Sequence, residues 1–310
     1  MRMGRTWLAI ALALLCIPVA RADLVWSYSY SGGGVSGSGY LTTSDTTSGG
    51  AYTITGISGL RGTVPLERLL APGTYSASGG GILVSDNLLN AAAPFLGFGG
   101  FTTQVGTDLV NVYYLNGDYH DIAGVDCPAA SCGDASHLGT VVNFTASLVP
   151  SLEWSFSYAG SGVSASGTLL TLATPVAGHY QIVGLSGARN GDAMNALFPA
   201  GTYGTAGGGI LISDNLLFPN PPFLDFGGFT FHAGSDRYNV YYSNGQYYDI
   251  AGADCPAANC GDANHLGTPI DFAVAQVPEP GSIALVALAL FALAHIARRR
   301  RGLRRNSIRR

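Results

Sequence analysis

Lysine is absent from this chain of 310 residues, and glutamate occurs only three times. Both residues favour helices, whereas the abundant Gly, Ser, Thr and Tyr favour turns and strands. No stretch between residues 23 and 278 repeats its apolar residues at the spacing of an amphipathic helix. These absences exclude a mainly helical fold.

Positive charge is also scarce in the middle of the chain. Between residues 23 and 278, four arginines face eighteen acidic residues, a net charge of −14. Such a surface repels a phosphate backbone, so we expect no nucleic-acid partner.

The signatures of catalysis are missing as well. G-x-S-x-G does not occur, and the glycine runs lack the Lys and the strand-to-helix setting of a phosphate-binding loop. His137 and His265 have Asp neighbours, but no activated nucleophile can be identified, which makes a hydrolase the weakest interpretation. We expect the protein not to be an enzyme.

The two ends of the chain have the composition of targeting segments. Residues 1–22 combine a basic start, an apolar core and a small-residue exit, which predicts a secretory signal peptide. At the other end, Val277, Pro278, Glu279 and Pro280 precede an apolar run from Ile283 to Ala297 and an arginine cluster that starts at Arg298. The apolar run predicts a short transmembrane sorting helix with the arginines on the cytoplasmic side.

Residues 277–310 resemble the PEP-CTERM sorting signal of Gram-negative bacteria, with motif, span and arginine cluster in that order. The resemblance implies exosortase as a partner, transient anchoring in the inner membrane, and removal of the tail. The mature protein is then expected at the cell surface or outside the cell. Bacteria that carry such signals make extracellular polysaccharide, which implies a role in a biofilm matrix with exopolysaccharide as a further partner.

The chain between the targeting segments is an internal duplication. Trp26 corresponds to Trp154, and Cys127 corresponds to Cys255, at a constant offset of 128 residues. More than half of the aligned positions are identical. We therefore predict two copies of one module, residues 23–149 and 152–276, called here the first and second repeat.

The two repeats have diverged unevenly. Only five of nineteen positions from Leu60 to Ser78 are identical in the second repeat, against seventeen of twenty from Asp121 to Thr140. The first stretch has the character of a tolerant loop. The second is structurally demanding or functional, and a recent duplication with uneven drift is the alternative explanation.

Alternation of apolar and polar residues predicts strands. Trp26, Tyr28 and Tyr30 alternate with serines, which indicates a sheet with one buried face. About eight such strands per repeat predict an all-β fold of two tandem antiparallel β-sandwich domains. One joint sheet system is the alternative, because the linker is so short. Short helices are expected only near Leu66–Leu70 and Ala193–Phe198.

Asn116-Gly117 and Asn244-Gly245 mark the clearest local element, a hairpin present in both repeats. Asn-Gly accepts the positive φ angles of a type I′ turn, which suits two paired strands. We expect the flanking tyrosines to pair across the hairpin.

Cysteines recur at the same spacing in both repeats, as Cys127 and Cys132 and again as Cys255 and Cys260. In an exported protein this pattern predicts one disulfide within each C-x4-C motif. A zinc site is the alternative, formed with nearby residues that are also duplicated. Its ligands would be Asp126, Asp134 and His137 with the first cysteine pair, or Asp254, Asp262 and His265 with the second.

Carboxylates beside these motifs suggest a calcium site, although no D-x-D-x-D-G loop occurs. The candidate ligands in the two repeats are Asp121, Asp126, Asp134, Asp249, Asp254 and Asp262. The first expectation for function is thus a non-catalytic surface or matrix protein without a cofactor. The alternative is a calcium- or glycan-binding module with its sites in the Asp121–Thr140 loop and the second copy of that loop.

Overall fold

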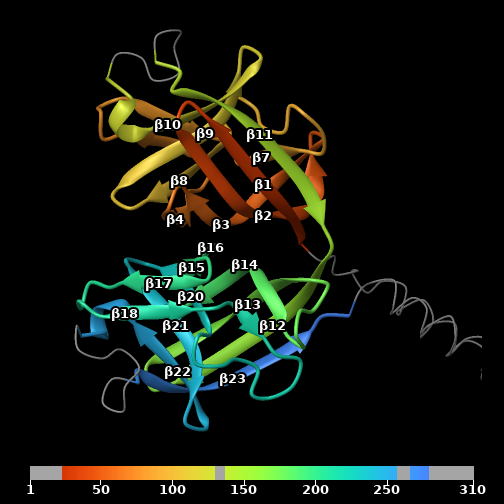
Figure 1. Cartoon of the computed structure of the whole chain (residues 1–310), viewed down its shortest axis with the longest axis vertical. Coiled ribbons are helices and arrows are strands. Elements are labelled where there is room, and N and C mark those ends of the chain that lie inside the picture. Colours follow the sequence, from red (N-terminus) through yellow and green to blue (C-terminus); the bar gives the residue numbers. More distant parts are fainter. Residues whose placement is uncertain (1–22, 130–136, 257–265, 279–310) are drawn as a thin grey trace, which may run out of the picture. The chain divides into compact units, whose positions relative to one another are not determined.

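The computed structural model describes residues 23–129, 137–256 and 266–278 (Figure 1). Regular structure in this part of the chain consists of strands and two 3-10 turns, η1 (Gly124–Asp126) and η2 (Gly252–Asp254). The all-β prediction is confirmed. The predicted signal peptide, the apolar run and the arginine cluster lie outside the described residues.

The first repeat contains eleven strands. They are β1 (Leu24–Gly32), β2 (Val35–Ser48), β3 (Ala51–Arg61), β4 (Val64–Leu69), β5 (Gly73–Ser76), β6 (Ile82–Ser85), β7 (Leu88–Asn90), β8 (Phe101–Val105), β9 (Asp108–Leu115), β10 (Asp118–Ala123) and β11 (Thr140–Val149). Eight of them form a closed circuit of antiparallel pairs, in the order β1-β2-β3-β4-β8-β9-β10-β11 and back to β1.

Strand β11 closes this circuit. Its first three residues pair with β10, and the residues from Asn143 onward pair with β1. Figure 1 shows β11 running along β1 before the chain enters the second repeat. A β-sandwich has two separate sheets, but here β11 pairs with both β10 and β1 and so joins them.

The second repeat has twelve strands. They are β12 (Ser151–Gly160), β13 (Val163–Leu172), β14 (Tyr180–Arg189), β15 (Asp192–Met194), β16 (Ala196–Leu197), β17 (Gly201–Gly204), β18 (Ile210–Ser213), β19 (Leu216–Leu217), β20 (Phe229–Ala233), β21 (Asp236–Ser243), β22 (Gln246–Ala251) and β23 (Thr268–Gln276). The same circuit recurs with one difference. The counterpart of β4 is divided at Asn195, so that β15 pairs with β14 and β16 pairs with β20.

Each circuit encloses its own apolar core. Trp26, Tyr28 and Phe101 lie in the first core, and Trp154, Phe156 and Phe229 lie in the second. Each Trp indole N–H donates to a threonine hydroxyl, at 3.2 Å in the first repeat and 3.0 Å in the second. The alternation that predicted the strands thus places aromatic side chains inside both circuits.

The predicted hairpins are confirmed in both repeats. Asn116 and Gly117 have φ angles of 55° and 100°, and Asn244 and Gly245 have φ angles of 50° and 85°. Tyr114 and Tyr119 face each other across the first hairpin with ring centroids 4.9 Å apart, and the equivalent pair in the second repeat is 4.8 Å apart. Positive φ at both turn residues is the geometry of a type I′ turn.

The predicted short helices are wrong. Leu66–Leu69 belongs to β4, and the stretch from Ala193 to Phe198 contributes to β15 and β16. These residues pair with neighbouring strands and bury their apolar side chains, which overrides their helix propensity. The same stretches lie in the segment of low identity between the repeats.

That segment lies at the junction between the repeats and is not a tolerant loop. Strand β16 pairs in parallel with β3, and the Ile57 amide donates to the Asn195 carbonyl at 3.0 Å. The Asn195 side chain donates to the Leu69 carbonyl at 2.9 Å. Arg237 forms an ion pair of 2.6 Å with Glu67.

The junction also has an apolar component, in which Val25 packs with Leu170 and Val183. Asp23–Val277 accordingly forms one compact unit. The structure does not separate the repeats into two domains. In the described residues no helix is long and apolar enough to cross a membrane.

Candidate functional site

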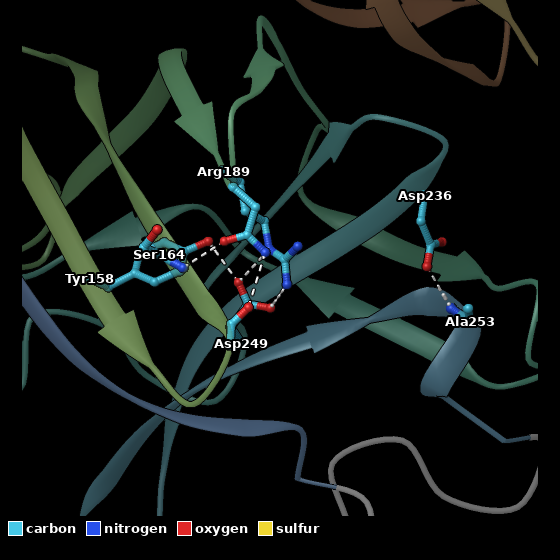
Figure 2. A network of polar contacts seen from close by, with 8 residues as sticks. Tyr158, Ser164, Arg189, Asp236, Asp249 and Ala253 are labelled. Carbon is cyan, nitrogen blue, oxygen red and sulfur yellow. Dashed lines mark hydrogen bonds and ion pairs between the residues drawn. The ribbon is translucent and has the colours of Figure 1, made fainter.

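An arginine–aspartate pair with a buried carboxylate lies at the same place in each repeat. Arg61 contacts Asp121 through Nη2 at 2.6 Å and Nε at 3.0 Å, and Arg189 contacts Asp249 through Nη2 at 2.7 Å and Nε at 2.9 Å. Figure 2 shows the second pair joined by the Tyr158 hydroxyl, which donates to Asp249 at 2.6 Å. A planar guanidinium and a carboxylate in this geometry make a strong bidentate contact.

The surroundings of the second pair reinforce it. Burial, and then the Asp249 carboxylate, raises the pKa of Tyr158 far above its ordinary value, so this phenol remains a donor. The Arg189 guanidinium also lies 3.6 Å from the centroid of the Tyr238 ring. These contacts tie neighbouring strands together.

These contacts do not fit the calcium prediction for Asp121 and Asp249. Each carboxylate is buried against a guanidinium, whose positive charge opposes a second cation at the same oxygens. Asp126 and Asp254 are exposed at the ends of the 3-10 turns, whereas Asp134 and Asp262 lie outside the described residues. Among the residues that the structure describes, no group of three or more His, Cys, Asp or Glu could hold a metal ion.

The first cysteine of each motif follows the 3-10 turn and is completely buried. Cys127 and Cys255 are both disulfide-bonded, which removes the thiolate that a zinc site requires. Cys132 and Cys260 lie outside the described residues, so the pairing within each C-x4-C motif stays a prediction.

A glycine triplet packs against each buried cysteine. Gly79 and Gly81 donate to the carbonyls of Gly124 and Cys127, both at 2.8 Å. A Cβ atom at Gly81 would collide with Cys127 Sγ, and the equivalent Gly209 has the same relation to Cys255. The triplet therefore permits the close backbone approach expected of glycine within a strand pattern.

Two side chains that the sequence analysis missed fix the 3-10 turns. Asp108 accepts hydrogen bonds from the Val125 amide at 3.0 Å and the Ser78 hydroxyl at 2.7 Å. Its counterpart Asp236 accepts from the Ala253 amide at 2.8 Å, as Figure 2 shows. Each hydrogen bond joins residues seventeen positions apart, so no local pattern reveals it. The only signal in the sequence is an Asp at the same place in both repeats.

A shallow pocket of about 20 Å³ occurs at the same position in each repeat, between the β5–β6 hairpin and the outer face of β9 and β10, or between their counterparts in the second repeat. We call these the twin pockets. The first is lined by Ile82, Leu83, Val84, Phe98, Asn111, Tyr113 and Ile122, and the second by Ile210, Leu211, Ile212, Phe226, Asn239, Tyr241 and Ile250.

Aromatic rings support the floor of both pockets. Phe98 meets the edge of Tyr113 with centroids 6.1 Å apart, and Phe226 meets Tyr241 at 5.7 Å. The Tyr113 hydroxyl donates to the Leu138 carbonyl at 2.7 Å, which ties the pocket to the segment after the cysteine motif. The exposed phenylalanine ring is thus backed by a fixed tyrosine in each repeat.

Comparison with known proteins gives one finding. Residues 276–301 match the PEP-CTERM protein-sorting motif. The match supports an exported protein with a C-terminal sorting signal that exosortase recognises. No curated protein and no solved structure matches the chain.

Proposed function

We propose that the chain is a non-catalytic exported protein that exosortase trims and delivers to the cell surface or the extracellular matrix, where it associates with exopolysaccharide. The sorting motif at residues 276–301 is the observation that carries this proposal. The predicted signal peptide agrees with it.

The structure of residues 23–277 supports the non-catalytic part. Its core charges serve the fold, since Arg61, Arg189 and Arg237 each hold a carboxylate in an ion pair. An exported protein must keep its fold outside the cell, where cysteines form disulfides. The duplicated architecture suits a protein that presents a surface.

Mass spectrometry of the full chain expressed with and without exosortase tests the proposal. We expect a product shortened at both ends when exosortase is present, and retention of residues 277–310 when it is absent. Replacing Pro278, Glu279 and Pro280 with alanine should block trimming, whereas Asn306→Ala, outside the matched residues, should not. Trimming that is independent of both exosortase and the motif would contradict the proposal.

The same spectra, recorded after alkylation, report the two predicted disulfides. We expect no alkylation of Cys127, Cys132, Cys255 or Cys260 without prior reduction. Complete alkylation of all four would show that the protein had folded in a reducing compartment.

The alternative prediction, a binding module at the Asp121–Thr140 loop, retains support only as a glycan site. Its calcium part conflicts with the ion pairs of Asp121 and Asp249. The twin pockets lie beside this loop, because Tyr113 bonds to the Leu138 carbonyl within it. Their position beside the loop supports them as the place where a glycan would bind.

A further inference from the structure

Exposed apolar side chains of this protein fall into two groups. Val64, Val125, Val141, Leu148 and Val176 are exposed outside the twin pockets. At the equivalent positions in the other repeat stand Asp192, Ala253, Pro269, Gln276 and Ser48. None of these five exposed side chains has a large apolar counterpart.

The exposed side chains of the twin pockets behave differently. Ile82 corresponds to Ile210, and Phe98 corresponds to Phe226. Phe98 is 52% exposed and Phe226 is 48% exposed, so the second repeat retains both the ring and its exposure. Both copies keep the exposed ring, whereas the other exposed apolar residues have no large apolar counterpart. This difference indicates a functional surface.

In each pocket, one side-chain oxygen has no hydrogen-bond donor among the residues that the structure describes. Asn111 is only 3% exposed and lines the pocket. Its Nδ2 donates to the carbonyls of Val84 and Gly99 at 2.8 and 2.9 Å, and it lies 2.9 Å from Thr102 Oγ1. Its Oδ1 has no donor among the described residues, and this atom is not fully buried.

Asn239 repeats this arrangement in the second pocket. It is also 3% exposed, and its Nδ2 donates to the carbonyls of Ile212 and Gly227 at 2.8 and 3.0 Å. A buried amide whose nitrogen is engaged, and whose oxygen has no donor among the described residues, can accept a hydrogen bond from a bound molecule. Water or a hydroxyl can supply one.

The same amide restricts what can bind. Asn111 already donates to the Val84 carbonyl, so it competes with an added strand for that acceptor of β6. This contact disfavours an extended peptide at Val84. The ligand must instead contact the side-chain face with both an apolar surface and a hydroxyl donor.

Charge narrows the choice further. Residues 23–278 carry a net charge of −14, which opposes the binding of acidic polymers. The two pockets are chemically alike and belong to one compact unit, so they match a ligand whose own chemistry repeats.

We propose that the twin pockets bind a neutral polysaccharide, with one sugar ring at each pocket. The C–H face of the sugar packs on the exposed ring of Phe98 or Phe226, and a hydroxyl donates to Oδ1 of Asn111 or Asn239. This inference deepens the proposed function by naming the polymer class and the residues that contact it. Two weak sites on one chain then act together through avidity.

Affinity gel electrophoresis of the full chain in mild detergent tests the proposal. The gels contain β-glucan, xyloglucan, amylopectin or galactomannan as neutral probes and alginate as the acidic probe. We expect at least one neutral polysaccharide, but not alginate, to retard the chain. Phe98→Ala or Phe226→Ala should weaken retardation about tenfold or more, and the double variant about a hundredfold or more.

Two matched variants separate a sugar site from a general apolar contact. Leu148→Ala removes an equally exposed apolar side chain and should leave binding unchanged, and Phe98→Tyr should retain binding whereas Phe98→Leu should not. Equal binding by the Tyr and Leu variants would overturn the role of the ring. So would failure of every neutral probe, or equal retardation by alginate.

Light scattering of the same samples tests self-association. A wild-type dimer that the double phenylalanine variant converts to a monomer would assign the pockets to a contact between copies and overturn the proposal. Exosortase trimming, measured in parallel, keeps the two proposals distinguishable. Normal trimming without polysaccharide binding would contradict only this inference. Polysaccharide binding without trimming would contradict only the proposed sorting.

Discussion

Replacement of Arg189 by methionine removes the only cation that touches the buried Asp249 carboxylate in the described structure. The variant loses two charge-assisted hydrogen bonds, at 2.7 and 2.9 Å, and leaves Tyr158 as the remaining donor. Asp249 is buried, so water does not replace the guanidinium. Breaking a buried ion pair on one side destabilises a protein by about 3–5 kcal/mol. We expect a loss in this range at pH 7.

Urea denaturation of the full chain, followed by tryptophan fluorescence, measures this loss. Trp26 and Trp154 are both buried, one in each core, so the signal reports both repeats. Arg68→Met is the matched control, because Arg68 is exposed. We expect the control to change the free energy of unfolding by less than about 0.5 kcal/mol.

A double variant decides whether the charge or the packing is responsible. Arg189→Met combined with Asp249→Leu removes both partners and leaves no uncompensated charge, so it should be more stable than Arg189→Met alone. A single variant that loses less than about 1 kcal/mol, or a double variant that is less stable than the single, would refute the reasoning.

Three further predictions concern the junction, pH and calcium. Glu67→Leu should lower the free energy of unfolding by about 1–3 kcal/mol in the same urea assay, because it leaves Arg237 without its 2.6 Å partner; an unchanged value would show that the ion pair adds no stability. Burial, and then a hydrogen bond with Asp225, raises the pKa of Asp214 to about 7. At acidic pH the folded state therefore binds a proton at Asp214 more readily than the unfolded chain does, and the stability that this proton contributes is lost as the pH rises through 7. Asp225→Gly should make the fall in Tm between pH 5 and pH 8 shallower, and an identical fall in both proteins would contradict the assignment. Calorimetry with calcium should detect no binding at Asp121 or Asp249, and saturable heat that disappears in Asp121→Asn would restore the calcium site.

Much of the fold could be predicted from local patterns. Alternation around Trp26 and the Asn-Gly turns identified strands and hairpins correctly, because these features depend on neighbours in the sequence. The division of the β4 counterpart at Asn195 could not be predicted in this way. It depends on contact with Ile57, which lies in the other repeat.

The segment of low identity shows why divergence between copies can mislead. Glu67 and Asn195 occupy equivalent positions, but one forms an ion pair with Arg237 and the other bonds to the Leu69 carbonyl. Two copies that meet through different elements must differ where they touch. The low identity between the repeats in this segment reflects an asymmetric contact, whereas the prediction of a tolerant loop took it as a lack of structural constraint.

The candidate site was only partly accessible from sequence. Aspartate near a cysteine motif suggested calcium, but the decisive partners Arg61 and Arg189 lie 60 residues away from Asp121 and Asp249. The twin pockets were missed because Phe98 and Ile82 resemble ordinary core residues in sequence, and only exposure distinguishes them. Comparing both copies for exposed apolar residues provides that distinction.

The first and last strands of each repeat are neighbours, since Val25 pairs with Val149 and Trp154 pairs with Gln276. Each repeat consequently starts and finishes at adjacent points. A gene segment encoding one repeat could be copied again in tandem without opening either circuit. Arrays of this kind can lengthen during evolution, provided that every new contact between successive units acquires its own complementary side chains.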